Sequence, residues 1–208
     1  MEKLFIKCKE NAVKIYQTFD ASHDFDHIER VMRNAEAIVK TELNVDANII
    51  RLAVLLHDID DVKYHSAANQ SASEILYSSG ADEELAKKVL ACIESVSFSG
   101  GNAKELTSIE GSIVRDADRL DTIGAIGIAR AFAFGGAKGR KLYDENEITR
   151  KNMDETEYRE RGTSTVTHFH EKLLLLKELM VTDEGKRLAE ERHRFMVEFL
   201  EQLDKEIG

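Results

Sequence analysis

Apolar residues recur at helical spacing along almost the whole chain. They nowhere alternate with polar residues over a sustained stretch, as the residues of a half-buried strand would. The pattern therefore predicts an all-α fold. The expected helices run through residues 4–19, 28–39, 49–56, 68–76, 85–96, 106–134, 166–180 and 188–203.

Local signals mark several helix ends. Asp46 is placed to cap the helix through 49–56, in which apolar side chains lie on nearly every side. The Ser-Ser-Gly run at 78–80 ends one helix, and Asp82 is placed to cap the next. Because a helix that is apolar all round lies inside a protein, we expect 49–56 in the middle of the core.

Two regions depart from this pattern. Gly124 and Gly127 lower the helix propensity of the stretch 106–134, although their small size would let a neighbouring backbone approach closely. The stretch 135–165 is polar and weakly periodic, and GGAKGR at 135–140 has the composition of a flexible hinge. Because long irregular segments within a domain are more often functional than inert, we expect a lid at 135–165.

Composition narrows the class of protein. A chain of 208 residues with 42% apolar residues suits one domain with a core of its own, and the absence of proline agrees with helices. Cys8 and Cys92 have no CxxC spacing, which opposes a disulfide framework or a cysteine zinc site. With no membrane-length apolar run and a charged first segment, MEKLFIKCKE, we expect a cytoplasmic protein without a membrane segment.

The charge balance bears on the ligand. The 39 acidic and 29 basic residues give a net charge of −10, which opposes stable binding of nucleic acid because such binding needs clustered lysine and arginine. A small phosphorylated ligand stays compatible, since a bound divalent cation inverts the local sign of a site built from carboxylates.

Histidines and aspartates stand at unusual places in the helical pattern. His23 and His27 are four residues apart, on one helix face if both are helical. His57 and Asp58 directly follow the apolar run LAVLL, and the later stretch VRDADRLD places three aspartates within six residues of a mostly apolar helix. Buried charges of this kind are costly unless they are paired or bound to a metal.

Two imidazoles and two carboxylates from three helices can converge on one divalent ion, with water completing the shell. Mixed nitrogen and oxygen donors suit manganese, cobalt, iron or magnesium better than a closed structural zinc site. Taken alone, the pair of His57 and Asp58 has a second interpretation, in which a histidine at a helix end pairs with a nearby carboxylate.

At these residues the chain resembles the HD-domain superfamily of metal-dependent phosphohydrolases. The superfamily pattern is a first histidine, a His-Asp doublet at a helix end and a distant aspartate, usually in an Ala-Asp-x-Leu context. His27 in DHIERV, His57 and Asp58 in LLHDID, and Asp118 in ADRL fill these places in order. The resemblance implies that these four residues bind the metal.

The likeness is closer to a group of small bacterial HD phosphohydrolases, whose motifs resemble HDFDHIER, HDIDDVK, DADRLDTIGAIGIAR and HFHEKLL of this chain. It covers nearly the whole chain, whereas the superfamily pattern covers about residues 20–125. It implies one HD domain over 1–208, with the metal site in a cleft between core helices. Residues 126–208 would form a helical extension that includes the expected lid.

The last metal ligand has two candidates in the sequence. Asp116 and Asp118 point about 200° apart on a helix and cannot both face one ion. The Ala-Asp-x-Leu context favours Asp118, and Asp116 would then pair with a neighbouring cation. Asp121 lies one turn after Asp118 and would either orient a ligand from outside or pair with another helix.

The resemblance also implies residues for catalysis. Asp61 and Lys63 follow the His-Asp doublet closely and match the family pattern. Asp61 is the candidate general acid or base, with Asp60 as its competitor. Lys63 is the candidate for binding a phosphate oxygen and offsetting charge in the transition state.

Four further residues are candidates for contacting the substrate. His23 lies near the first ligand in sequence, and Arg119 follows the last one. His168 and Lys172 share a helix face and belong to the HFHEKLL motif. Each also has a structural interpretation as a helix-end, paired or surface residue.

The sequence thus predicts a metal-dependent phosphohydrolase that uses one divalent ion, Mn, Co, Mg or Fe. Its expected substrate is a small phosphorylated metabolite with a phosphomonoester or phosphoanhydride, a nucleotide first among them, and its expected state is a monomer or homodimer. One alternative is hydrolysis of a cyclic nucleotide or an alarmone at a phosphodiester or pyrophosphate bond. The other is a non-catalytic HD module that senses a ligand.

Overall fold

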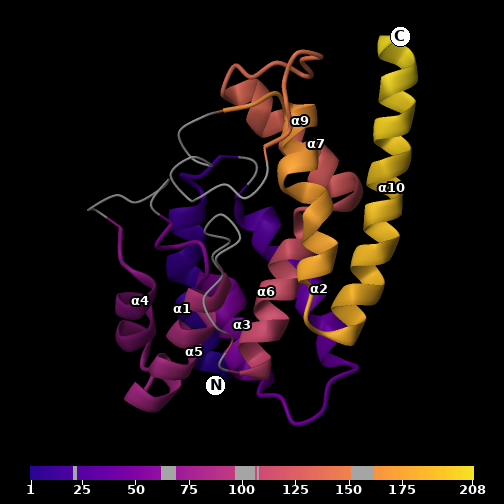
Figure 1. The fold of residues 1–208 in the computed structure, drawn as a ribbon. Coiled ribbons are helices and arrows are strands. Elements are labelled where there is room, and N and C mark those ends of the chain that lie inside the picture. The colour runs from indigo at the N-terminus through magenta and orange to yellow at the C-terminus, as the bar shows by residue number, and fades with distance from the viewer. Residues whose placement is uncertain (21–22, 62–68, 97–105, 107, 151–161) are drawn as a thin grey trace. The chain divides into compact units, whose positions relative to one another are not determined.

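The computed structural model describes residues 1–20, 23–61, 69–96, 106, 108–150 and 162–208. Helices dominate these residues and no strand occurs among them, which confirms the predicted all-α fold (Figure 1). In chain order the elements are α1 (Glu2–Tyr16), α2 (Phe25–Val39), α3 (Ala47–Leu56), α4 (Ala72–Ser79), α5 (Glu83–Val96), α6 (Ile109–Asp121), α7 (Gly124–Ala137), α9 (Thr165–Glu171), the 3-10 helix η2 (Leu173–Leu179) and α10 (Asp183–Ile207).

The chain forms two compact units that divide within α6, after Asp118. The first unit contains α1 to α5 and most of α6, and the second runs from Arg119 to the end of the chain. No single helix among the described residues is long and apolar enough to cross a membrane, while the bent pair of α6 and α7 reaches that length and composition only when both helices are taken together.

Helix α3 is the centre of the first unit. It packs against α1, α2 and α5. Its residues from Leu52 to Leu56 are all at most 1% exposed, as expected for a helix that is apolar on every side. The predicted cap is confirmed, because the Asp46 carboxylate accepts hydrogen bonds from the backbone N–H groups of Asn48 and Ile49.

Capping residues also fix α4 and α5. Ser71 and Glu74 form a capping box at the start of α4. The predicted helix end at 78–80 is confirmed, since Gly80 ends α4 with a φ of 105°, a conformation that favours glycine. The Asp82 carboxylate accepts the backbone N–H of Leu85 at 2.8 Å, which confirms it as the cap of α5.

One continuous helix over 106–134 is wrong, because α6 ends at Asp121 and α7 begins at Gly124. Gly124 has a φ of +75°, which places it in the left-handed region. A Cβ atom at Gly127 would overlap the backbone carbonyl of Thr122. The glycines therefore permit a tight turn between two helices, whereas the apolar spacing alone predicts one uninterrupted helix.

The second unit packs α7 against α9 and α10, and η2 against α9 and α10. The rings of Phe132, Phe169 and Phe199 lie 5.9 to 6.3 Å apart between centroids and join three of these helices. The single helix expected over 166–180 is interrupted at Lys172, whose ψ of −60° and φ of −137° separate α9 from η2.

The segment expected to be a lid is partly described. Gly135, Gly136 and Ala137 belong to α7, so the hinge predicted at 135–140 is wrong for these residues. The backbone N–H groups of Thr165 and Val166 donate to the carbonyls of residues 141 and 142. Residues 151–161 lie outside the described residues, and a lid stays a prediction.

A partly buried ion pair holds residue 150 against α9. The Glu171 carboxylate accepts from Arg150 Nε at 2.7 Å and Nη2 at 2.9 Å, and from the hydroxyl of Thr163 at 3.1 Å.

His168 lies one turn before Glu171 in α9. Burial, and then the positive charges of Lys172 and Arg140, lower the pKa of His168 to about 3.

This depressed pKa gives the stability of the protein an acid dependence. His168 stays neutral in the folded state between about pH 3 and 6.5, while the unfolded chain takes up a proton there. Wild-type protein therefore loses stability relative to a His168→Gln variant as the pH falls below 6.5, by about 1–2 kcal/mol at pH 5. Urea unfolding of both proteins at pH 5 and 7.5 measures the change. His170→Gln, at an exposed position of the same helix, is the control. If His168→Gln and His170→Gln changed the pH dependence of stability equally, the depressed pKa of His168 would be contradicted.

Candidate metal centre

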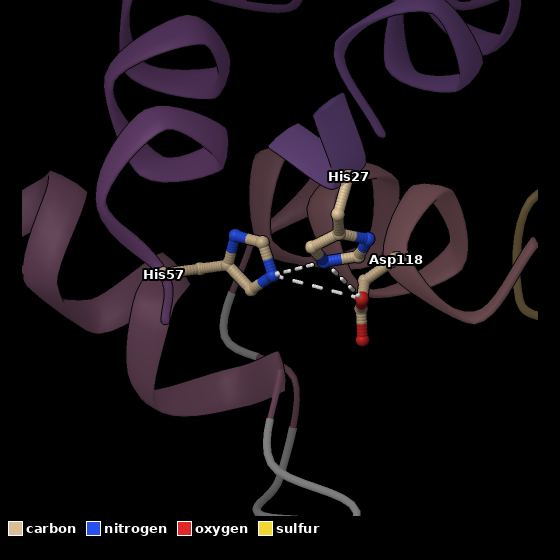
Figure 2. A group of neighbouring side chains, drawn as sticks. All are labelled: His27, His57 and Asp118. Carbon is tan, nitrogen blue, oxygen red and sulfur yellow. Dashed lines mark hydrogen bonds and ion pairs between the residues drawn. The ribbon is translucent and has the colours of Figure 1, made fainter. Parts of the chain in front are cut away.

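Three side chains from three helical segments of the first unit converge at one point (Figure 2). His27 comes from the first turn of α2, His57 from the end of α3 and Asp118 from α6. The Nε2 atoms of the two imidazoles lie 3.4 Å apart, and Asp118 Oδ1 lies 3.5 Å from His27 Nε2 and 3.6 Å from His57 Nε2.

Asp58 completes the group. Its Oδ2 lies 3.4 Å from His27 Nε2, and its Oδ1 lies 3.4 Å from His57 Nε2. The Oδ2 atom is buried and accepts no hydrogen bond from the described residues. A buried carboxylate oxygen without a donor is costly, so this atom is suited to a cation.

The backbone sets the tautomer of His57. Its Nδ1 lies 2.9 Å from the carbonyl oxygen of Val54, one turn back in α3. Since a carbonyl can only accept, Nδ1 donates there and Nε2 faces the other three side chains, where it offers a lone pair when the ring is neutral. Metal-binding histidines are commonly oriented by such a contact of the second ring nitrogen.

The charges of the group are strongly coupled. Burial alone would lower the pKa of His57, but the carboxylates of Asp58 and Asp118 raise it to about 9. Burial alone would raise the pKa of both aspartates, but the imidazoles hold the pKa of Asp118 at about 2 and that of Asp58 well below its usual range. The site therefore favours two ionised carboxylates together with positive charge between them.

The donors fit a divalent ion. Ligand atoms that each lie about 2.0–2.2 Å from an ion stand about 3–3.5 Å apart, close to the separations seen here. The two imidazoles are buried, while the side chains of Asp58 and Asp118 are 15% and 22% exposed. Solvent thus reaches the carboxylate side of the group.

Local structure explains how these residues come together. The Asp24 carboxylate caps α2 by accepting the backbone N–H of His27 at 3.1 Å. The Asn34 side chain of α2 donates to the carbonyl of Ala117 in α6 at 3.0 Å, in buried surroundings. Asp24 is recognisable in the sequence as an aspartate at a helix start, whereas nothing in the sequence marks Asn34, which was missed.

The two candidates for the last ligand differ in position. Asp118 faces the imidazoles, whereas Asp116 is fully buried and is not part of the group that the described residues form around His27 and His57. Asp121 forms an ion pair at 2.8 Å with Arg130, within the second unit. This contact matches the interpretation of Asp121 as a helix-pairing carboxylate.

The residues after the doublet have different contacts. The Asp60 carboxylate accepts the backbone N–H of Ala72 at 3.2 Å and so supports the start of α4. The backbone N–H of Asp61 donates to the carbonyl of Asp58 at 3.1 Å, in the turn that follows α3. Lys63 lies outside the described residues.

His23 lies beside the group. Its ring centroid is 5.9 Å from that of His27, in an edge-to-face arrangement, and its Nδ1 lies 3.6 Å from the Asp20 carboxylate. The side chain is 19% exposed. His23 therefore stands between the buried imidazoles and solvent.

The remaining candidates belong to the second unit. Arg119 is buried and donates to the carbonyl of Leu179. His168 and Lys172 lie at the end of α9, where both are half-buried. Their part in binding a substrate stays a prediction.

Comparison with known proteins identifies the family. Residues 24–123 match the HD domain, a range that contains all four converging side chains. The uncharacterized protein YpgQ of Bacillus subtilis is 43% identical over 192 residues, covering 90% of this chain and 85% of YpgQ.

Solved structures agree over nearly the full length. A protein from Lactobacillus plantarum superposes with a TM-score of 0.87 at 34% identity, covering 99% of this chain and 97% of that protein. An HD-superfamily hydrolase from Bacillus thuringiensis gives 0.75 at 38% identity, with 99% and 97% covered. YpgQ crystallised in complex with ADP gives 0.74 at 38% identity, with 96% and 98% covered. The chain belongs to the HD-domain family and has the fold of its hydrolases.

Proposed function

We propose that this protein is a metal-dependent phosphohydrolase that cleaves a phosphomonoester or phosphoanhydride bond of a nucleotide. The observation that carries the proposal is the convergence of His27, His57, Asp58 and Asp118, with the buried Asp58 Oδ2 lacking a hydrogen-bond donor among the described residues. The complex of YpgQ with ADP supports a nucleotide as the substrate class.

The four side chains would hold one divalent ion through two nitrogens and two carboxylate oxygens. This donor set suits Mn, Co, Fe or Mg. When bound, such an ion polarises a phosphoryl oxygen and lowers the pKa of a water molecule. The ion also supplies the positive charge that lets a protein of net charge −10 bind a phosphate.

The chain's own residues supply the rest of the chemistry. Asp61 follows the doublet by three residues and would accept a proton from the attacking water or return one to the leaving oxygen. Lys63 would hold a phosphate oxygen and offset the charge that grows on it. Asp60 is committed to the backbone of Ala72, which favours Asp61 for the proton transfer.

Substrate contacts would come from His23, Arg119, His168 and Lys172. His23 is adjacent to the metal ligands and partly exposed, so it is placed to donate to a phosphate or ribose oxygen. Arg119, His168 and Lys172 stay candidates from their sequence motifs, with Lys172 directly after α9 and four residues from His168.

Removal and return of metal ions test the proposal. Protein dialysed against a chelator is expected to be inactive on nucleoside mono-, di- and triphosphates. Mn²⁺, Co²⁺ or Mg²⁺ should restore hydrolysis, measured by chromatography of the products. His57→Ala and Asp58→Ala should lose the bound ion and lower activity by more than about 100-fold. This is a larger loss than mutation of a residue that only orients a metal ligand causes.

His170→Ala and Asp204→Ala, both at exposed positions, are the matched controls and should keep metal content and activity. Full activity of the His57 and Asp58 variants would refute the metal site. If the wild-type protein hydrolysed no nucleotide with any of the ions but bound a nucleotide tightly, a ligand-sensing module would be indicated instead.

A pair of neighbouring variants separates catalysis from structure. Asp61→Asn should lower turnover by about 10²–10⁴-fold with unchanged thermal stability, because it removes the proton-transfer group. Asp60→Ala should instead cost about 1 kcal/mol of stability, since Ala72 loses its hydrogen-bond acceptor. Steady-state kinetics and thermal unfolding distinguish them, and the reverse pattern would make Asp60 the acid or base.

A further inference from the structure

A tyrosine distant in sequence contacts the segment that carries the His-Asp doublet. Tyr16 is the last residue of α1, and its side chain is completely buried. Its hydroxyl donates to the carbonyl oxygen of Leu55 at 3.0 Å, across 39 positions of the chain. Leu55 lies two residues before His57, in the last turn of α3.

This carbonyl lacks its usual helical partner. In a continuing helix the Leu55 carbonyl would accept the N–H of residue 59, but Ile59 donates to Leu56 instead, at 3.2 Å. The preceding carbonyl, that of Val54, accepts His57 Nδ1. The last turn of α3 is therefore stabilised by two side-chain donors, one from His57 and one from Tyr16, in place of the regular backbone ladder.

The ring of Tyr16 contacts the second imidazole-bearing segment. Its centroid lies 6.2 Å from the ring of Phe25, the first residue of α2 and two positions before His27. Phe19 packs edge-on against the same tyrosine at 5.2 Å. A single side chain thus touches the backbone next to His57 and the helix start next to His27.

Burial, and then the nearby Asp58 carboxylate, raise the pKa of Tyr16 well above its usual value. The hydroxyl therefore keeps its proton at neutral pH and remains a donor. Tyrosine fits the position because its ring fills the core while its hydroxyl reaches a polar partner.

We infer that Tyr16 is a positioning residue for the metal-binding side chains, holding the end of α3 by its hydroxyl and the start of α2 by its ring. The inference rests on the proposed metal site. Without the hydroxyl, the buried Leu55 carbonyl loses its donor, and the turn that orients His57 and Asp58 relaxes. The expected result is a weaker affinity for the metal ion, because mutation of residues that orient metal ligands typically lowers metal affinity by about 10–100-fold.

Tyr16→Phe tests the inference, since it removes one oxygen and keeps the ring. Calorimetric titration of MnCl2 into chelator-treated full-length protein should give a Kd raised about tenfold over wild type. Two controls accompany it. Tyr77→Phe removes the hydroxyl of a tyrosine that is 48% exposed and should leave the Kd unchanged.

The second control tests whether a general loss of stability alone changes metal binding. Ile75→Val removes a methylene group from the core at α4, which packs on α1 and α5. It should lower the unfolding temperature of the metal-free protein without changing the Kd. A Tyr16→Phe protein whose Kd stays within twofold of wild type, whatever its unfolding temperature, would overturn the inference.

Two further outcomes are distinguishable from these. If wild-type protein binds no Mn²⁺, the proposed metal site fails rather than the role of Tyr16. If Tyr16→Phe does not fold, Phe25→Leu at a half-buried position tests the ring contact. A raised Kd for Phe25→Leu supports the inference, and an unchanged Kd contradicts it.

Discussion

Two imidazoles and two carboxylates share one small, mostly buried volume, and this electrostatic constraint governs the first unit of the protein. Buried carboxylates are tolerated only beside positive charge. Without an ion, the pKa of His57 rises to about 9 because the aspartates around it favour the protonated ring. A divalent cation supplies this positive charge at neutral pH, and the imidazoles then stay neutral and bind it through their ring nitrogens.

The scaffold meets this constraint by separating apolar packing from polar contacts. Helix α3 buries the apolar run from Leu52 to Leu56 completely, and the polar residues His57 and Asp58 follow directly where the helix ends. Three side chains then hold the ligand-bearing backbone from outside: Asp24 at the start of α2, Asn34 on the carbonyl next to Asp118, and Tyr16 on the last turn of α3. Ligands held in this way need little rearrangement on binding an ion.

Apolar spacing predicted most of the helices, and the polar residues Asp46 and Asp82 were recognised as caps. Charge next to apolar runs drew attention to the histidines and aspartates, and the resemblance to the HD-domain superfamily then selected the four residues that converge. These patterns failed where geometry depends on a single turn, as at Thr122, whose carbonyl closely approaches Gly127 and breaks an otherwise periodic stretch. Tyr16 and Asn34 were invisible for another reason. An aromatic or an asparagine on an amphipathic helix looks like ordinary packing until the carbonyl that it contacts is known.

The position of a bound ion tests the central claim most directly. Crystals soaked in MnCl2 and measured near the manganese absorption edge should show one strong anomalous peak within bonding distance of the Nε2 atoms of His27 and His57. Oxygens of Asp58 and Asp118 should complete the protein ligands, at about 2.0–2.3 Å from the ion. A peak bound elsewhere, or none beside these imidazoles at millimolar manganese, would contradict the metal centre on which the proposed hydrolysis depends.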